Sequence, residues 1–107
     1  MISAAVFKTI GAHNKQKLHT LLLDDCIGFN AKMLETIRGF PKLKVLHMKN
    51  VGLTLTFQAG QVLGSLSRLV DLDISDSTVD VTSFSIICNT CQHLKTLVCQ
   101  NCKGMDD

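Results

Sequence analysis

The sequence contains no tryptophan and no tyrosine, and five phenylalanines are its only aromatic residues. Proteins that bind single-stranded nucleic acid stack the bases on aromatic side chains, so such a stacking platform is not available here. The net charge of +2 and the pI of about 8.3 also fall short of the basic stripe that a nucleic-acid-binding domain carries. We therefore expect no nucleic-acid partner.

Long apolar runs are missing as well. The N-terminal segment reaches four consecutive apolar residues and is then interrupted by Lys8, whereas a secretory signal needs an apolar stretch of roughly 7–15 residues. No other run approaches the roughly 20 residues of a membrane-spanning helix. The sequence therefore predicts neither a secretory leader nor a membrane partner.

The cysteine content argues against a secreted protein. Five cysteines is an odd number, and secreted disulfide frameworks use even numbers. The chain also lacks the Asn-x-Ser/Thr pattern of N-glycosylation. Reduced thiols in the cytoplasm or the nucleus are the expectation that follows.

Length and composition predict one folded unit. The 107 residues match the size of a single compact domain. With 46% hydrophobic and 19% charged residues, the chain can bury a core, which separates it from intrinsically disordered proteins of low hydrophobicity and high net charge.

A repeat runs through most of the chain. Four segments align without gaps, and their first residues lie 25, 26 and 25 positions apart: Leu18–Cys26, Leu43–Val51, Leu69–Ser77 and Leu94–Cys102. The first, fourth and sixth places of each segment are apolar, and nine of these twelve residues are leucine. Self-similarity at a period of 20–50 residues indicates a repeat architecture.

The repeat predicts alternating strands and helices. Side chains at the fourth and sixth places share one face of a strand, so strands are expected near 20–25, 45–50, 71–76 and 96–101, with these side chains inward. Between the strands, apolar residues recur at three-to-four spacing, which is the pattern of a helix face. Phe40, Leu66 and Cys91 lie three residues before a strand segment, and Ile37, Leu63 and Cys88 lie six before it. We therefore expect each helix to pack on the sheet in the same way.

These segments resemble the leucine-rich repeat pattern L-x-x-L-x-L-x-x-N/C, and Cys26 and Cys102 at the ninth place are similar to its cysteine-containing subclass. The resemblance implies an α/β fold: a right-handed leucine-rich-repeat solenoid with a parallel β-sheet on the concave side and helices on the convex side. Residues 18–107 would hold about four repeats, as a fragment of a longer array. Residues 1–17 would be a partial N-terminal cap or an incomplete repeat.

Two C-x-x-C pairs raise the alternative of a zinc site. Cys88, Cys91, Cys99 and Cys102 have the spacing at which four sulfurs can share one tetrahedral ion. In the repeat register, however, the equivalent residues one unit earlier are Leu63, Leu66, Ile74 and Ser77. Because free cysteine packs as a small apolar residue, we expect core cysteines rather than metal ligands, and no cofactor.

No pattern in the chain predicts catalysis. The H-E-x-x-H, phosphate-loop and G-x-S-x-G motifs are absent from the sequence, and its four histidines do not cluster. The pair Gly60 and Gly64 lies in the second helical stretch, where it predicts close packing on an adjacent helix or a weak helix. We therefore expect a protein that is not an enzyme.

The outward side of the predicted sheet is the candidate binding site. Its third, fifth and seventh places include both charged and apolar residues: Leu22, Asp24, Val45, His47, Lys49, Asp71, Asp73, Val98 and Gln100. Pairing of His47 or Lys49 with Asp73 across strands would only keep such a face soluble. Its apolar members have no role in folding, so we expect another protein to bind on this concave face.

The resemblance suggests a more specific role. Cysteine-containing repeats of this kind are similar to those of substrate receptors in cullin-based ubiquitin ligases, such as F-box and Zyg-type proteins. The resemblance implies that this chain recognises a substrate. A cullin-adaptor complex would bind through regions outside the chain. A non-enzymatic scaffold or assembly factor would use the same surface, and the sequence leaves both alternatives open.

Overall fold

The computed structural model describes residues 16–26 and 28–104. Of the predicted cap at 1–17, only residues 16 and 17 belong to these ranges, so that prediction lies almost entirely outside the described residues. Residues 105–107 of the expected repeat region also lie outside the described residues. Within the described ranges, no helix has the length and apolar character needed to cross a membrane.

Four short strands form a parallel sheet in the order β1-β2-β4-β6. Their bounds are Thr20–Leu22, Val45–His47, Asp71–Asp73 and Thr96–Val98. Each strand lies inside one of the predicted ranges but is only three residues long. The register aligns the fourth repeat place of every unit, Leu21 with Leu46, Leu72 and Leu97. A second parallel pair joins β3 (Thr54–Leu55) to β5 (Thr78–Val79).

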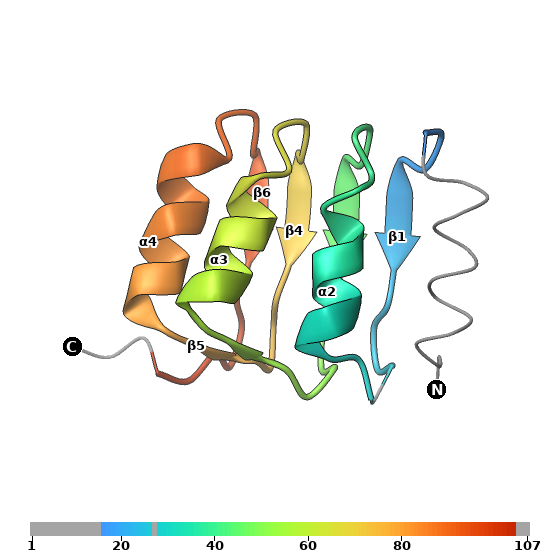
Figure 1. The fold of residues 1–107 in the computed structure, drawn as a ribbon. Coiled ribbons are helices and arrows are strands. Elements are labelled where there is room, and N and C mark those ends of the chain that lie inside the picture. Colours follow the sequence, from blue (N-terminus) through green and yellow to red (C-terminus); the bar gives the residue numbers. More distant parts are fainter. Residues whose placement is uncertain (1–15, 27, 105–107) are drawn as a thin grey trace.

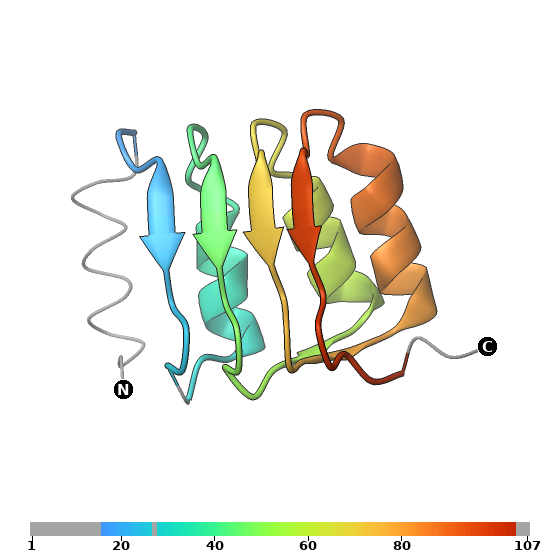
Figure 2. The ribbon, with the colours of Figure 1, turned by 180° about the vertical axis from the view of Figure 1, so that it is seen from behind.

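Three helices return the chain from the end of one strand to the start of the next. They are α2 (Ala31–Ile37), α3 (Phe57–Gly64) and α4 (Val81–Thr90). Each follows a polar N-cap, Asn30, Thr56 or Asp80, whose side chain accepts a backbone N–H of the first turn. All three helices lie on one face of the main sheet (Figure 1). Seen from behind, the strands lie in front of the helices, and no described helix covers this second face (Figure 2).

The turn after each strand of the main sheet contains one non-glycine residue in the left-handed conformation. These residues are Asp25, Asn50, Asp76 and Asn101, with φ of 62°, 56°, 62° and 57°. Asp and Asn enter this region more readily than other non-glycine residues because their short side chains bond locally. The turns also stack, since the Asn50 side chain donates to the Asp25 carboxylate at 2.9 Å. Sequence reasoning considered the ninth repeat place and missed this acid or amide at the eighth.

The hydrophobic core lies between the sheet and the helices. The predicted inward residues of the two central units, Leu46, Met48, Leu72 and Ile74, are fully buried. Their equivalents in the last unit, Leu97 and Cys99, are half-buried. The last unit is less buried because no described unit packs on its outer side.

One predicted core position is wrong. Cys88 was expected to be buried like Ile37 and Leu63, but it is exposed. The reason is positional: α4 packs against α3 on one side, and no described helix packs on its other side. Ile87 takes the buried place on α4 instead.

The two glycines of α3 face α4. A Cβ on Gly60 would lie 2.6 Å from the Ser83 hydroxyl and 2.8 Å from the Ser83 Cα, and one on Gly64 would meet the Thr90 side chain. Contacts this short are not tolerated, so glycine at both positions lets the helices approach closely. Of the two roles expected for this pair, close packing on an adjacent helix is the one that the geometry supports.

Candidate functional site

The uncovered side of the main sheet, which we call the open face, brings the predicted site residues together. Strand pairing places Thr20, Val45, Asp71 and Thr96 in one row across the sheet. A second row contains Leu22, His47, Asp73 and Val98. Asp24, Lys49 and Gln100 follow two residues later, in the turns that leave the strands. The nine predicted residues thus come from four units of the chain.

The open face mixes apolar and charged side chains. Leu22 is 62% exposed, the highest value among the large hydrophobic residues described. Val45 and Val98 are half-buried, as are Asp71 and Asp73. Leu22 is exposed on the edge strand β1, and Val45 and Val98 lie half-buried farther along the same face, so a partner could exclude water from these apolar side chains.

His47 forms the one ion pair found on this face among the described residues. Its Nε2 lies 3.0 Å from the Asp71 carboxylate, with the two side chains 31% and 33% exposed. The sequence suggested that His47 or Lys49 pairs with Asp73, and Asp73 lies directly opposite His47 in the register. His47 pairs instead with Asp71, its diagonal neighbour on β4. A side chain as long as histidine can reach a diagonal neighbour on the adjacent strand.

Asp73 is engaged differently. Its Oδ1 accepts the backbone N–H of Ser75 at 2.9 Å, within its own chain segment. Neither His47 nor Lys49 forms an ion pair with it in the described part of the chain. The centre of the open face therefore holds a half-buried carboxylate whose charge no described residue neutralises.

The turns at the rim of this face are held by side chain to backbone bonds. The Asp24 carboxylate accepts the Lys49 N–H at 2.9 Å, and the Ser75 hydroxyl accepts the Gln100 N–H at 3.0 Å. Both bonds join neighbouring units, so part of the predicted site also has a structural role. Ser75 itself is buried, although its repeat place was expected to face outward.

Two of the cysteines bond to backbone carbonyls. Among the residues that the structure describes, no three His, Cys, Asp or Glu side chains are placed to hold a metal ion. The Cys91 thiol donates to the Leu63 carbonyl at 3.5 Å, and the Cys102 thiol donates to the Ile74 carbonyl at 3.2 Å. These thiols satisfy backbone groups of the preceding unit, so the zinc alternative has no geometric support.

Two of the thiols are held in the protonated form. Burial raises the pKa of Cys99 to about 12, with further contributions from its hydrogen bond with Cys102 and from nearby charge. Burial also raises the pKa of Cys91. A nucleophilic cysteine needs a lowered pKa, so these two thiols are poor nucleophiles at neutral pH.

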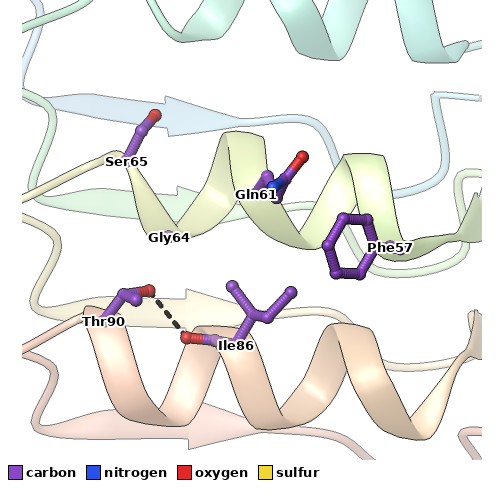
Figure 3. A pocket seen from close by; sticks show the side chains of 6 residues that line it. All are labelled: Phe57, Gln61, Gly64, Ser65, Ile86 and Thr90. Atoms are coloured by element: carbon purple, nitrogen blue, oxygen red, sulfur yellow. Dashed lines mark hydrogen bonds between the residues drawn. The ribbon is translucent and has the colours of Figure 1, made fainter.

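A groove on the helical side was not expected from the sequence. It lies between α3 and α4, has a volume of about 520 Å³ and is lined by Phe57, Gln61, Gly64, Ser65, Ile86 and Thr90 (Figure 3). The Ser65 and Thr90 hydroxyls both donate to carbonyls of their own helices, at 2.6 Å. The groove has no charged lining, so it offers little to orient a ligand.

Comparison with known proteins supports the fold and leaves the family open. No protein-family model and no curated protein matches this sequence. Among solved structures, the C-terminal domain of tropomodulin from Caenorhabditis elegans is similar, with a TM-score of 0.70 at 7% sequence identity. The match covers 94% of this chain and 65% of that chain. The neighbour has a leucine-rich-repeat-like fold, and at this identity the likeness concerns the fold alone.

Proposed function

We propose that this chain is part of a leucine-rich-repeat solenoid that binds another protein on its open face. In this proposal the sheet forms the concave side and the helices form the convex side. Repeat proteins of this kind present an extended curved surface to their partners. The proposal concerns a binding module and assigns no chemical reaction to it.

The observation that carries the proposal is the composition of the open face. Leu22 is exposed there, while Val45, Val98 and the carboxylate of Asp73 lie half-buried without a described element to cover them. Apolar side chains on this side add nothing to the core, which is filled from the other side of the sheet. A protein partner would remove them from water.

Quantitative affinity purification tests this proposal. The chain, a variant with Asp71→Lys and Asp73→Lys, and a control with Glu35→Lys on α2 would be compared for co-purifying proteins by mass spectrometry. Glu35 lies on α2 on the helical side, where it pairs with Arg38 at the surface. We expect at least one partner to be lost from the open-face variant and kept by the control. Retention of every partner by the folded open-face variant would contradict the proposal.

The narrower role in a cullin-based ubiquitin ligase stays a prediction from the sequence resemblance. The same purification tests it when the gene's full-length product is used. A cullin and its adaptor should then co-purify with both variants, because they would bind outside this chain. Their absence would favour the alternative of a scaffold or assembly factor.

A further inference from the structure

The charge of Asp73 lacks compensation within the described part of the chain. Asp71 shares its charge with His47 at 3.0 Å, whereas Asp73 receives only the neutral N–H of Ser75, on Oδ1. No cation of the described residues lies within ion-pair distance of Asp73. A half-buried carboxylate has lost part of its hydration, so a cation supplied from outside would bind it more strongly than a fully solvated acid.

Each of the two aspartates has one valine and one polar residue beside it, His47 next to Asp73 and Thr96 next to Asp71. In the sheet register Val98 lies directly beside Asp73, and Val45 lies directly beside Asp71. Both valines are half-buried on the open face. The two carboxylates belong to one face of β4, two residues apart, which corresponds to about 7 Å along the strand. The site is therefore a pair of carboxylates, each flanked by one valine.

We infer that the partner on the open face contributes an arginine side chain, which lies on Val98 and binds the carboxylates of Asp73 and Asp71. This inference rests on the proposed function and names the chemistry of its partner: a protein segment that carries arginine beside apolar side chains. Asp73 Oδ2 and Asp71 Oδ1 are the acceptor atoms that the bonds to Ser75 and His47 leave available.

Arginine fits this arrangement better than lysine. Its planar guanidinium offers five donors and can bond two carboxylates at once, while its methylene stem packs on apolar groups. Leu22 lies two strands from Asp73 in the same row, or about 10 Å away at the usual strand spacing. An apolar partner residue at that distance from the arginine would cover Leu22. The partner must therefore present an arginine and an apolar side chain about 10 Å apart.

Selection from a phage-displayed library of random peptides on the immobilised chain tests the inference. We expect the enriched peptides to contain an arginine near apolar residues. Their affinities would then be measured by fluorescence anisotropy for the chain and for Asp73→Asn, which keeps the acceptor for the Ser75 N–H and removes the charge. The variant should bind about tenfold more weakly or worse, and peptide Arg→Lys should also weaken binding. Glu35→Gln serves as the matched control and should bind like the unmodified chain.

The outcomes separate this inference from the proposed function. Enriched peptides without a basic residue, or undiminished binding by Asp73→Asn, would overturn the arginine site. In either case Leu22→Asp together with Val98→Asp would still abolish binding if the open face is the docking surface. If that double variant, shown to be folded by circular dichroism, binds the peptides normally, the proposed function falls as well.

Discussion

At the scale of the residue, equivalent positions differ because their neighbours differ. Leu72 and Leu97 occupy the same repeat place and pair in the register. Leu72 is fully buried between two units, whereas Leu97 is half-buried in the last strand. The repeat pattern predicts the inward direction of both side chains. It cannot predict their burial, which depends on what packs beside them.

Truncation of these two leucines should therefore have unequal effects. We expect Leu72→Ala to lower the free energy of unfolding by about 2–5 kcal/mol, the range for deleting a buried leucine side chain. Leu97→Ala should cost less, under about 2 kcal/mol, because the part already in contact with water loses nothing. Urea denaturation followed by circular dichroism measures both values. A larger loss for Leu97→Ala would contradict the assigned burial.

The Cys99 thiol should make stability depend on alkaline pH. Its pKa is raised in the folded state from an ordinary value of 9.0 to about 12. Below pH 9 the thiol is protonated in both states, and its contribution to stability is fully present. Between pH 9 and 12 the unfolded state releases the proton more readily, so stability falls as the pH rises. Urea denaturation at pH 8 and pH 10.5 should show a smaller fall for Cys99→Ala than for the unmodified chain.

Cys88→Ala is the control for this pH dependence, because Cys88 is exposed. Its fall in stability between the two pH values should be larger than that of Cys99→Ala, because Cys88 is only the smallest of the contributions to the raised pKa of Cys99. Equal falls in all three proteins would show that Cys99 is not the responsible group.

At the scale of the element, the contact between α3 and α4 is the most extensive one between the described helices. Gly60 and Gly64 were identified from the sequence, and both now face α4. A Cβ on Gly60 would meet backbone atoms of Ser83, whereas one on Gly64 would meet mainly the side chains of Thr90 and Ile86. Backbone atoms cannot move aside without shifting the helix, but a side chain can rotate.

Alanine substitutions at these glycines should separate the two cases. Gly60→Ala gains up to about 1 kcal/mol of helix propensity but forces α3 and α4 apart, at a cost of roughly 1–3 kcal/mol for overpacking. We expect a net loss of stability for Gly60→Ala and a smaller change of either sign for Gly64→Ala, measured as the shift in thermal midpoint. A stabilised Gly60→Ala would show that the helices do not pack at this distance.

The sequence predicted the elements well where a periodic apolar pattern specified them. The parallel sheet, its inward leucines and the helices on one side are confirmed as a mixed α/β fold. The pattern missed features that depend on single contacts. The left-handed turn residues, such as Asn50, follow from local backbone geometry. His47 pairs with Asp71 rather than Asp73, and this depends on how far the histidine side chain reaches across the sheet.

At the scale of the whole molecule, the two sides of the sheet differ in composition and in what covers them. One side carries the helices and the core, and the fold depends on it (Figure 1). The other side carries Leu22, the His47–Asp71 pair and the uncompensated Asp73 (Figure 2 shows this side of the sheet). The sequence assigned residues to this face from alternation alone. It could not name the partner, because a solenoid fold hosts many binding functions.

The central claim is that a protein partner binds the open face, and amide chemical-shift mapping tests it most directly. A peptide selected on the chain would be titrated into the isotope-labelled protein. We expect the largest shift changes at Thr20–Leu22, Val45–His47, Asp71–Asp73 and Thr96–Val98, with little change in α2. Changes confined to the α3–α4 groove around Phe57 and Ile86 would place the binding surface on the helical side and contradict the account.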